Sequence, residues 1–182
     1  MKWDYEFDVV VIGSGNGALT SALCSHDGGA KTLVIEKSNQ FGGTSATSGG
    51  GVWIPNNRYA RAENVDDSNK DARDYIDSVS PEGQIKDDLV ETYLSEGTKM
   101  IDYLHENSQV KYRNLQHYPD YFPDNPGGKA GNRSMEPEPI NGTELGDDLS
   151  KLREQHPQTA FTMGPINMNF TQKNCLMGSI SV

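Results

Sequence analysis

The stretch that decides the fold runs from Phe7 to Glu36 and reads FDVVVIGSGNGALTSALCSHDGGAKTLVIE. Residues 7–12 are nearly continuous in β-branched apolar side chains, which is typical of a parallel strand covered on both faces. A glycine-rich turn follows, and apolar residues then recur at helical spacing until Gly28 and Gly29 provide a stop. Because residues 32–35 repeat the strand pattern, the stretch predicts a right-handed βαβ unit.

The turn of this unit carries a dinucleotide-binding fingerprint. Gly13 and Gly15 allow the backbone to approach a pyrophosphate closely at the positive end of a helix dipole, and Ala18 occupies the third small position. Glu36 ends the second strand, where an acidic side chain accepts hydrogen bonds from ribose hydroxyls. A flexible glycine turn beside a surface glutamate is the alternative, and the order strand, turn, helix, strand and acid argues against it.

The segment after Glu36 decides between NAD and FAD, since both cofactors share the fingerprint. Residues 41–56 read FGGTSATSGGGVWIPN, a second stretch rich in glycine and hydroxyl groups. Such a loop can line the diphosphate, the ribityl chain and the flavin edge, which nicotinamide cofactors do not require. A glycine/serine linker would not lead directly into an apolar stretch such as residues 52–55. We therefore predict FAD.

The predicted FAD contacts come from the turn, the acid and the second loop. They are Gly13, Ser14, Gly15, Asn16, Gly17, Ala18, Glu36, Lys37, Gly42, Gly43, Thr44, Ser45, Ser48, Gly49 and Gly50.

Two amphipathic helices follow. Ser68 begins a capping box, and the apolar spacing after it predicts a helix that Pro81 ends. A second helix can start at Ser80–Pro81, with Ile85, Leu89, Tyr93, Leu94, Met100, Ile101 and Leu104 on or near one face.

Beyond Gln109 proline and glycine are too frequent for long regular elements, and no further buried strand is evident. We expect an α/β fold: a Rossmann-like FAD-binding βαβ unit, then helices, then an irregular Pro/Gly-rich segment. The expected divisions are 1–60 for the βαβ unit and flavin loop, 61–108 for the helical segment, and 109–182 for an incomplete loop-rich segment. A doubly wound fold needs more parallel strands, so we interpret the chain as truncated, the N-terminal part of a larger protein.

Composition restricts the partners. The 16 basic and 26 acidic side chains give a net charge of −10, which disfavours nucleic acid and anionic membrane surfaces. Cys24 and Cys175 show no metal-ligand spacing, and two cysteines suit a reducing compartment. With no signal peptide and no membrane-spanning stretch evident, we expect a cytoplasmic protein without a metal site.

Several motifs together resemble one known family. Residues 8–15, Glu36–Lys37, 41–45 and 48–56 look like the opening of the 3-ketosteroid dehydrogenases, within the FAD-dependent oxidoreductase 2 (fumarate reductase/succinate dehydrogenase flavoprotein) family. The similarity continues through residues 100–104 and 118–122. The resemblance implies hydride transfer from a carbon next to a ketone to flavin N5, with an α,β-unsaturated ketone, and most naturally a steroid, as product. The electron acceptor is not implied.

The resemblance also implies a tyrosine base or carbonyl donor in the segment Tyr118–Pro119–Asp120–Tyr121. Tyr121 is the first choice and Tyr118 the second; an aromatic-proline segment that only packs against its neighbours stays an open alternative. Family members with covalent flavin use a histidine near the glycine loop, and residues 42–51 contain none, so noncovalent FAD is implied.

Two other functions stay open. One is a fumarate reductase-like flavoprotein, which needs arginine and histidine clusters for its substrate carboxylates, and Arg133 alone offers little support. The other is a truncated, non-catalytic FAD-binding module.

Overall fold

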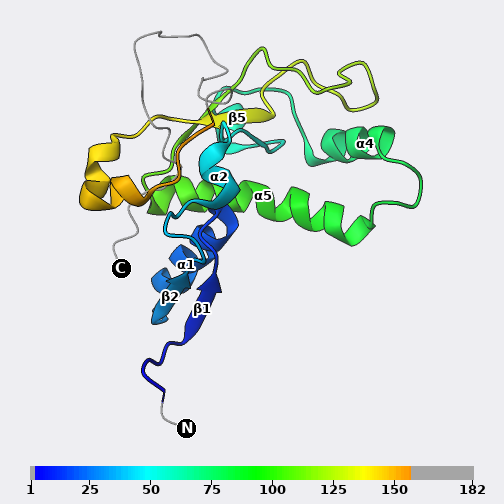
Figure 1. Cartoon of the computed structure of the whole chain (residues 1–182). Helices are drawn as coiled ribbons and strands as arrows, with labels where there is room; N and C mark the ends of the chain where they lie inside the picture. Colours follow the sequence, from blue (N-terminus) through cyan, green and yellow to red (C-terminus); the bar gives the residue numbers. More distant parts are fainter. Residues whose placement is uncertain (1–2, 157–182) are drawn as a thin grey trace. The chain divides into compact units, whose positions relative to one another are not determined.

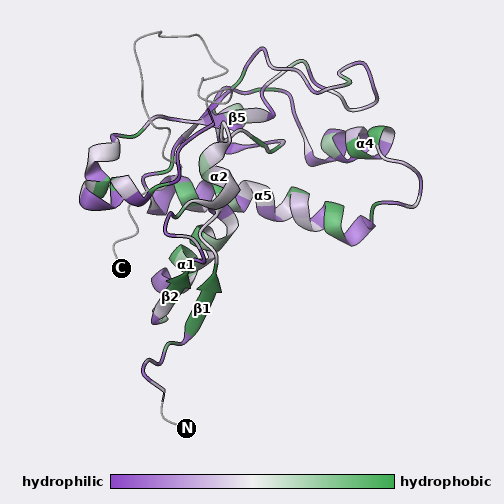
Figure 2. Cartoon of the chain, viewed as in Figure 1, coloured by the Kyte–Doolittle hydropathy of each residue, from purple (hydrophilic) through white to green (hydrophobic). Residues whose placement is uncertain are grey.

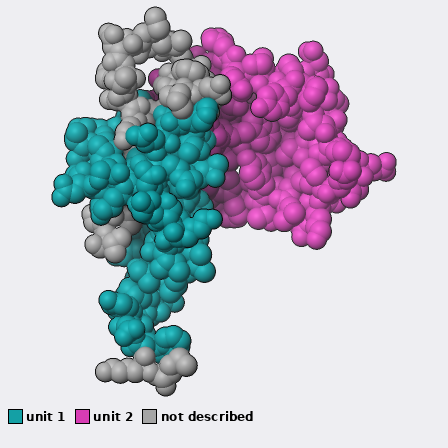
Figure 3. All heavy atoms as spheres, viewed as in Figure 1, with its two compact units in different colours: residues 1–50, 139–161, 168–182 teal, residues 51–138, 162–167 magenta. Residues whose placement is uncertain are grey.

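The computed structural model describes residues 3–156, which divide into two compact units. Within the described residues, the first unit comprises 3–50 and 139–156, and the second comprises 51–138 (Figure 3). Each unit is described by itself below.

The first unit contains the predicted βαβ arrangement (Figure 1). β1 (Val9–Ile12) pairs in parallel with β2 (Thr32–Ile35), and α1 (Asn16–Asp27) connects them and contacts both strands. Figure 2 shows that both strands are strongly hydrophobic, which is the pattern on which the prediction rested. The βαβ prediction is confirmed, and within residues 3–156 this parallel sheet has two strands.

A later segment of the chain completes the first unit. Phe41 forms a parallel bridge with Leu152, in which the Phe41 amide donates to the Lys151 carbonyl at 2.9 Å. The 3-10 segment η1 (Gly142–Lys151), interrupted at Gly146, precedes this bridge. Leu152 is buried among the apolar side chains of Leu19, Phe41, Ala46, Ile140, Leu145 and Leu149. The segment 139–156 therefore packs against the predicted flavin loop.

The second unit contains a small antiparallel sheet in the order β3-β5-β4. The strands are β3 (Val52–Trp53), β4 (Tyr112–Asn114) and β5 (Ser134–Pro137). The expectation of no further buried strand beyond Gln109 was wrong, because Met135, Glu136 and Pro137 of β5 are buried. The strands have only two to four residues, and β5 buries a carboxylate paired with Arg113, so no apolar pattern reveals them.

Three helices accompany this sheet: α3 (Arg58–Ala62), α4 (Asn69–Val79) and α5 (Asp87–Asn107). The predicted start of α4 is confirmed, because the Ser68 side chain accepts a hydrogen bond from the Asp71 amide. The predicted start of α5 at Pro81 was wrong. A turn closed by the Gln84 amide and the Pro81 carbonyl comes first, and the helix then begins with two aspartates, which its dipole favours.

The buried face of α5 agrees with the predicted one at Leu94, Ile101 and Leu104 and differs from it in the first turns of the helix. Its buried residues are Val90, Leu94, Gly97, Ile101 and Leu104, a regular three-four spacing. Ile85, Leu89 and Tyr93, which we expected on the apolar face, are exposed. Val90 and Leu94 form a core cluster with Ala72 of α4, against which Trp53 and Ile76 pack.

Candidate functional site

The glycine turn joins β1 to the N-terminus of α1. The Gly13 amide donates to the Ile35 carbonyl at 2.7 Å, which ties the end of β1 to the end of β2. No side chain caps α1 at its N-cap residue, Gly15. The first amides of a helix and its dipole favour a negatively charged ligand, so this end of α1 can receive a phosphate.

Ser14 connects the turn to the other two predicted contact regions. Its side chain is buried, and its hydroxyl donates to Glu36 Oε2 at 2.5 Å while accepting from the Gly42 amide at 2.9 Å. One hydroxyl therefore holds the turn, Glu36 and the start of the second loop together.

Glu36 is held as a carboxylate. The Ser14 hydroxyl lowers the pKa of Glu36 below its usual value, and the Ser38 amide, which donates to Oε1 at 3.1 Å, acts in the same direction. Two carboxylate oxygens offer about four acceptor positions, so this side chain retains capacity for the hydroxyls of a ribose.

The second loop lies directly against the turn. The Ser45 hydroxyl accepts from the Asn16 amide at 3.0 Å. Gly43 has φ +56°, and a Cβ there would lie 3.3 Å from Gly15 Cα, so the two glycine segments approach backbone to backbone. A Cβ on Gly13 or Gly17 would meet no protein atom within 4 Å, which leaves open space beside the turn. These features fit a dinucleotide whose diphosphate approaches the turn.

The rest of the loop differs from the expected irregular conformation, because residues Gly43–Thr47 form the short helix α2. The Ser48 hydroxyl donates to the Ser45 carbonyl at 2.8 Å and accepts from the Gly50 amide at 3.1 Å. Among the other predicted contact residues, Lys37, Thr44 and Gly17 are exposed, and Ala18 and Gly49 are half-buried. Gln155, to which no sequence motif points, also contacts this loop: its side-chain amide donates to the Ser48 carbonyl at 3.2 Å.

The predicted tyrosines belong to the second unit. Tyr121 is 84% exposed and Tyr118 is 37% exposed, whereas Asp120 between them is buried at 6%. Asp120 Oδ1 accepts from Trp53 Nε1 at 2.7 Å, and Oδ2 accepts from Arg133 Nη1 at 2.8 Å. The sequence analysis did not single out Asp120, since a carboxylate between two tyrosines carries no recognised motif.

Arg133 lies in the interior of the second unit at 1% exposure. Its guanidinium also binds Asp67, with Nη2 donating to Oδ1 at 2.7 Å. A guanidinium that is buried and bound to two carboxylates is not available for a substrate carboxylate. The small support that Arg133 offered to a dicarboxylate site is therefore lost.

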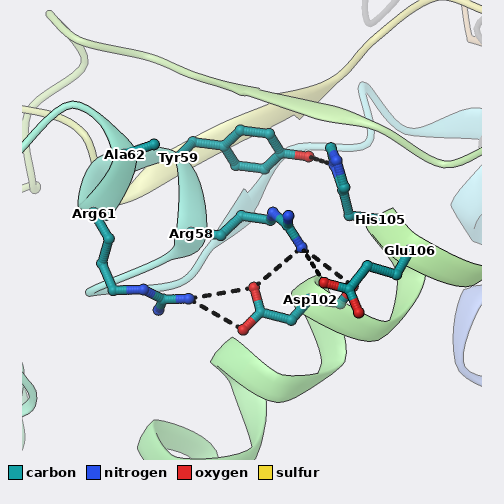
Figure 4. Close-up of a pocket in the computed structure, with 7 residues that line it drawn as sticks. All are labelled: Arg58, Tyr59, Arg61, Ala62, Asp102, His105 and Glu106. Atoms are coloured by element: carbon teal, nitrogen blue, oxygen red, sulfur yellow. Dashed lines mark hydrogen bonds and ion pairs between the residues drawn. The ribbon is translucent and has the colours of Figure 1, made fainter.

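A polar pocket of about 460 Å³ lies between α3 and α5 (Figure 4). Tyr59 Oη lies 2.9 Å from His105 Nδ1 and accepts from the Tyr112 amide at 2.9 Å. The Tyr59 hydroxyl accepts from the Tyr112 amide and either donates to Nδ1 or accepts from it, according to the tautomer of His105. Burial, followed by the charges of Arg58 and Lys111, lowers the pKa of His105.

The charged residues of this pocket pair with each other. Arg58 contacts Asp102 at 3.5 Å and Glu106 at 3.2 Å, and Arg61 contacts Asp102 at 3.1 Å. No role was predicted for His105 from the sequence. His105 and Glu106 follow Asp102 by three and four residues on α5, and this spacing is the sequence signal that could have indicated the pocket. The pairing connects α3 to α5 and leaves no excess charge for a ligand.

Residues 3–156 contain no candidate for a metal site or for a membrane span. In that part of the chain, no group of three or more His, Cys, Asp and Glu side chains is arranged to hold a metal ion. Across the same residues, no helix has the length and apolar character needed to cross a membrane.

Comparison with known proteins gives consistent matches. The family model described as FAD binding domain matches residues 8–177. The 3-oxosteroid 1-dehydrogenase of Mycolicibacterium smegmatis is 36% identical over 171 residues, covering 94% of this chain and 30% of the relative. The 4-oxocyclohexanecarboxylate 2-dehydrogenase of Sinomonas cyclohexanicum is 38% identical, covering 86% of this chain and 27% of the relative.

A solved structure agrees with these matches. The 3-ketosteroid delta1-dehydrogenase from Sterolibacterium denitrificans, in complex with 1,4-androstadiene-3,17-dione, superposes with a TM-score of 0.77 at 40% identity. The match covers 82% of this chain and 26% of that one. The chain thus spans less than a third of the length of the relatives it matches.

Proposed function

The chain belongs to the FAD binding domain family, and we propose that it provides the FAD-binding part of a dehydrogenase that acts on 3-ketosteroids. The observation that carries the proposal is the identity of 36% to a 3-oxosteroid 1-dehydrogenase, which extends over 94% of the chain and includes both units. FAD is the cofactor. Its noncovalent attachment stays a prediction from the absence of histidine in residues 42–51.

In the proposed function, the first unit holds the cofactor. Backbone amides at the start of α1 receive the diphosphate, Glu36 accepts from ribose hydroxyls, and the loop beginning at Gly42 contacts the remaining diphosphate and ribityl groups. When bound, FAD supplies the acceptor for a hydride taken from the carbon next to a ketone. The Ser14 hydroxyl keeps Glu36 ionised and oriented for this task.

The proposed contribution of the second unit is a proton-handling tyrosine. Tyr121 presents its hydroxyl to solvent, and we assign it the removal of a proton next to the ketone or donation to the carbonyl oxygen. Tyr118 is the second choice for this role. The product would be an α,β-unsaturated ketone.

A smaller ring ketone is the second candidate substrate. The relative from Sinomonas cyclohexanicum is named for 4-oxocyclohexanecarboxylate, and its identity of 38% is similar to that of the steroid enzymes. Both candidates contain a cyclic ketone, but the steroid adds a fused apolar ring system, whereas the smaller compound carries a carboxylate.

The proposal can be tested by purifying the polypeptide encoded by the complete reading frame and assaying its flavin content and its activity on ketones. We expect flavin absorbance in the purified protein, and turnover of androstenedione with an artificial electron acceptor. Turnover of 4-oxocyclohexanecarboxylate alone would favour the smaller substrate. Bound flavin without turnover of either ketone would contradict the proposed activity and favour a non-catalytic FAD-binding module.

A further inference from the structure

We propose that the buried ion network Asp67–Arg133–Asp120 is a positioning device that holds the segment Tyr118–Tyr121 in place for substrate. The inference rests on the proposed function, because it assigns a role to the residues that orient Tyr121. No sequence motif indicates that these three charged side chains orient Tyr121.

The network is fully enclosed within the second unit. The side chains of Asp67, Asp120 and Arg133 are 3%, 2% and 1% exposed. Arg133 bridges the two carboxylates at 2.7 and 2.8 Å, and its guanidinium carbon lies 5.6 Å from the Trp53 ring centroid. Bidentate pairing and stacking of this kind fix the direction of an arginine, so Asp120 is held in one place.

Asp67 is fixed in turn by backbone amides. The Asn56 amide donates to Oδ2 at 2.8 Å, and the Ser68 amide donates to Oδ1 at 2.9 Å. These amides belong to the segment after β3 and to the N-cap of α4. The network is therefore anchored by the turn that follows β3 and by the start of α4.

Asp120 transmits this anchoring to the tyrosine segment. Its own amide donates to the Lys129 carbonyl at 3.0 Å, and the Lys129 amide donates to Asp120 Oδ2 at 3.0 Å. On the other side of Tyr121, the Phe122 amide donates to Tyr75 Oη at 3.3 Å. The backbone is thus held on both sides of Tyr121, while the Tyr121 ring itself projects into solvent.

The loop that follows is packed against α4. A Cβ on Gly127 would lie 2.0 Å from the Asp71 carbonyl oxygen, so backbone meets backbone there. Lys129 adds an ion pair to Asp71 at 3.2 Å. The loop from His117 to Lys129 therefore has contacts at its base and along its length, and an exposed tyrosine is presented from a rigid support.

A purely structural role would make the network replaceable. A buried ion network costs desolvation, and well-packed apolar residues of similar volume often stabilise as well or better. Asp120, however, whose carboxylate pairs with Arg133, lies in sequence between Tyr118 and Tyr121, the two tyrosines predicted to face the substrate. Hydrogen bonds and ion pairs at this position fix the orientation of the backbone that carries the tyrosines, whereas an apolar contact does not fix a direction.

The experiment compares three variants of the polypeptide encoded by the complete reading frame. Asp120→Asn removes the charge at nearly constant size, and Trp53→Phe removes the indole donor to Asp120 but keeps an aromatic ring at this position. The control Glu136→Gln neutralises another buried carboxylate of the same unit, which pairs with Arg113 on the small sheet. A 3-fluorotyrosine at position 121 reports on the tyrosine itself by ¹⁹F NMR.

We expect Asp120→Asn to lower kcat about 10- to 100-fold, the effect of misplacing a reacting group by about 1 Å, with flavin absorbance and KM little changed. The ¹⁹F resonance at position 121 should broaden or split. Trp53→Phe should do the same to a smaller extent, and it carries the test if Asp120→Asn fails to fold. Glu136→Gln should leave both kcat and the resonance unchanged.

Two results would overturn the inference: an unchanged resonance and kcat in the folded Asp120 or Trp53 variant, or equal losses in the Glu136→Gln control. If the unaltered protein binds flavin but turns over no ketone, the proposed function fails. The ¹⁹F comparison still decides whether the network holds position 121.

Discussion

The flavin loop of the first unit and the tyrosine segment of the second are held by different kinds of force. The first is held by backbone amides and serine hydroxyls, such as the Ser45 hydroxyl on the Asn16 amide. The second is held by three enclosed charges around Arg133. A cofactor site needs unhindered amides for phosphate, whereas a segment that presents an exposed tyrosine needs a stiff support. Each region thus has the contacts that its role in the proposed function requires.

Of the variants that test this comparison, Arg133→Met should have the largest effect, a loss in the free energy of unfolding. The substitution leaves Asp67 and Asp120 buried without their cation, and breaking a buried pair in this way costs about 3–5 kcal/mol. We expect that loss in the free energy of unfolding, measured with urea by circular dichroism. As a control, Arg73→Gln removes a guanidinium that pairs with the exposed carboxylates Asp77, Asp87 and Glu91, and its loss should be much smaller. Equal losses would show that enclosure does not distinguish the two ion clusters.

An intermediate effect is expected for the backbone contact in the first unit. Gly43→Ala adds a Cβ 3.3 Å from Gly15 Cα, so one of the two glycine segments must shift, and FAD binding should weaken about tenfold, or about 1.4 kcal/mol. The left-handed φ of +56° adds a loss of stability that the control shares. Flavin titration measures the Kd. Gly29→Ala is a matched control, since its φ is +87° and its Cβ meets nothing within 4 Å. It should lower stability without changing the Kd, and a similar Kd change in both variants would refute the role of the Gly43 contact.

The smallest effect is a pH dependence at Ser14. Ser14→Ala removes a bond to the Gly42 amide, at about 1 kcal/mol, and also the bond that lowers the pKa of Glu36. A lowered carboxylate pKa stabilises the fold above the ordinary value of 4.5, and this contribution disappears as the pH falls through the folded-state pKa. The difference in unfolding free energy between Ser14→Ala and the unaltered protein should therefore shrink on acidification. A difference that stays constant with pH would contradict the Ser14–Glu36 coupling.

The cofactor region could be predicted because its determinants are close in sequence. Residues 13–16, Glu36 and residues 42–45 fall within one βαβ unit and the loop after it, and each residue type has a local reason to be there. The supports of the tyrosine segment come from Trp53, Asp67 and Arg133, which no short pattern connects. For this reason the ion network could not be predicted from the sequence, whereas a role for the tyrosines is predicted by resemblance and stays a prediction.

The error in the predicted apolar face of α5 has a different cause. Ile85 and Leu89 fit an apolar helical spacing, but the first turns of α5 bury Val90 in their place, next to the predicted Leu94. Two stripes one residue apart are nearly equivalent in sequence, and only the partner surfaces on α4 and β3 decide between them. The short strands β3, β4 and β5 were not predicted for the same reason, because their pairing partners are distant in the chain.

The alternation along β1 has a practical consequence for handling this polypeptide. Val10 and Ile12 are 51% and 82% exposed, and Ile35 on the neighbouring strand is also exposed, so one face of the two-stranded sheet is a bare aliphatic surface. Surfaces of this kind, next to unpaired strand edges, promote aggregation. Expressed as these residues alone, the polypeptide would self-associate as its concentration rises, and lysine substitutions at Val10 and Ile12 would be the first choice for keeping it dispersed.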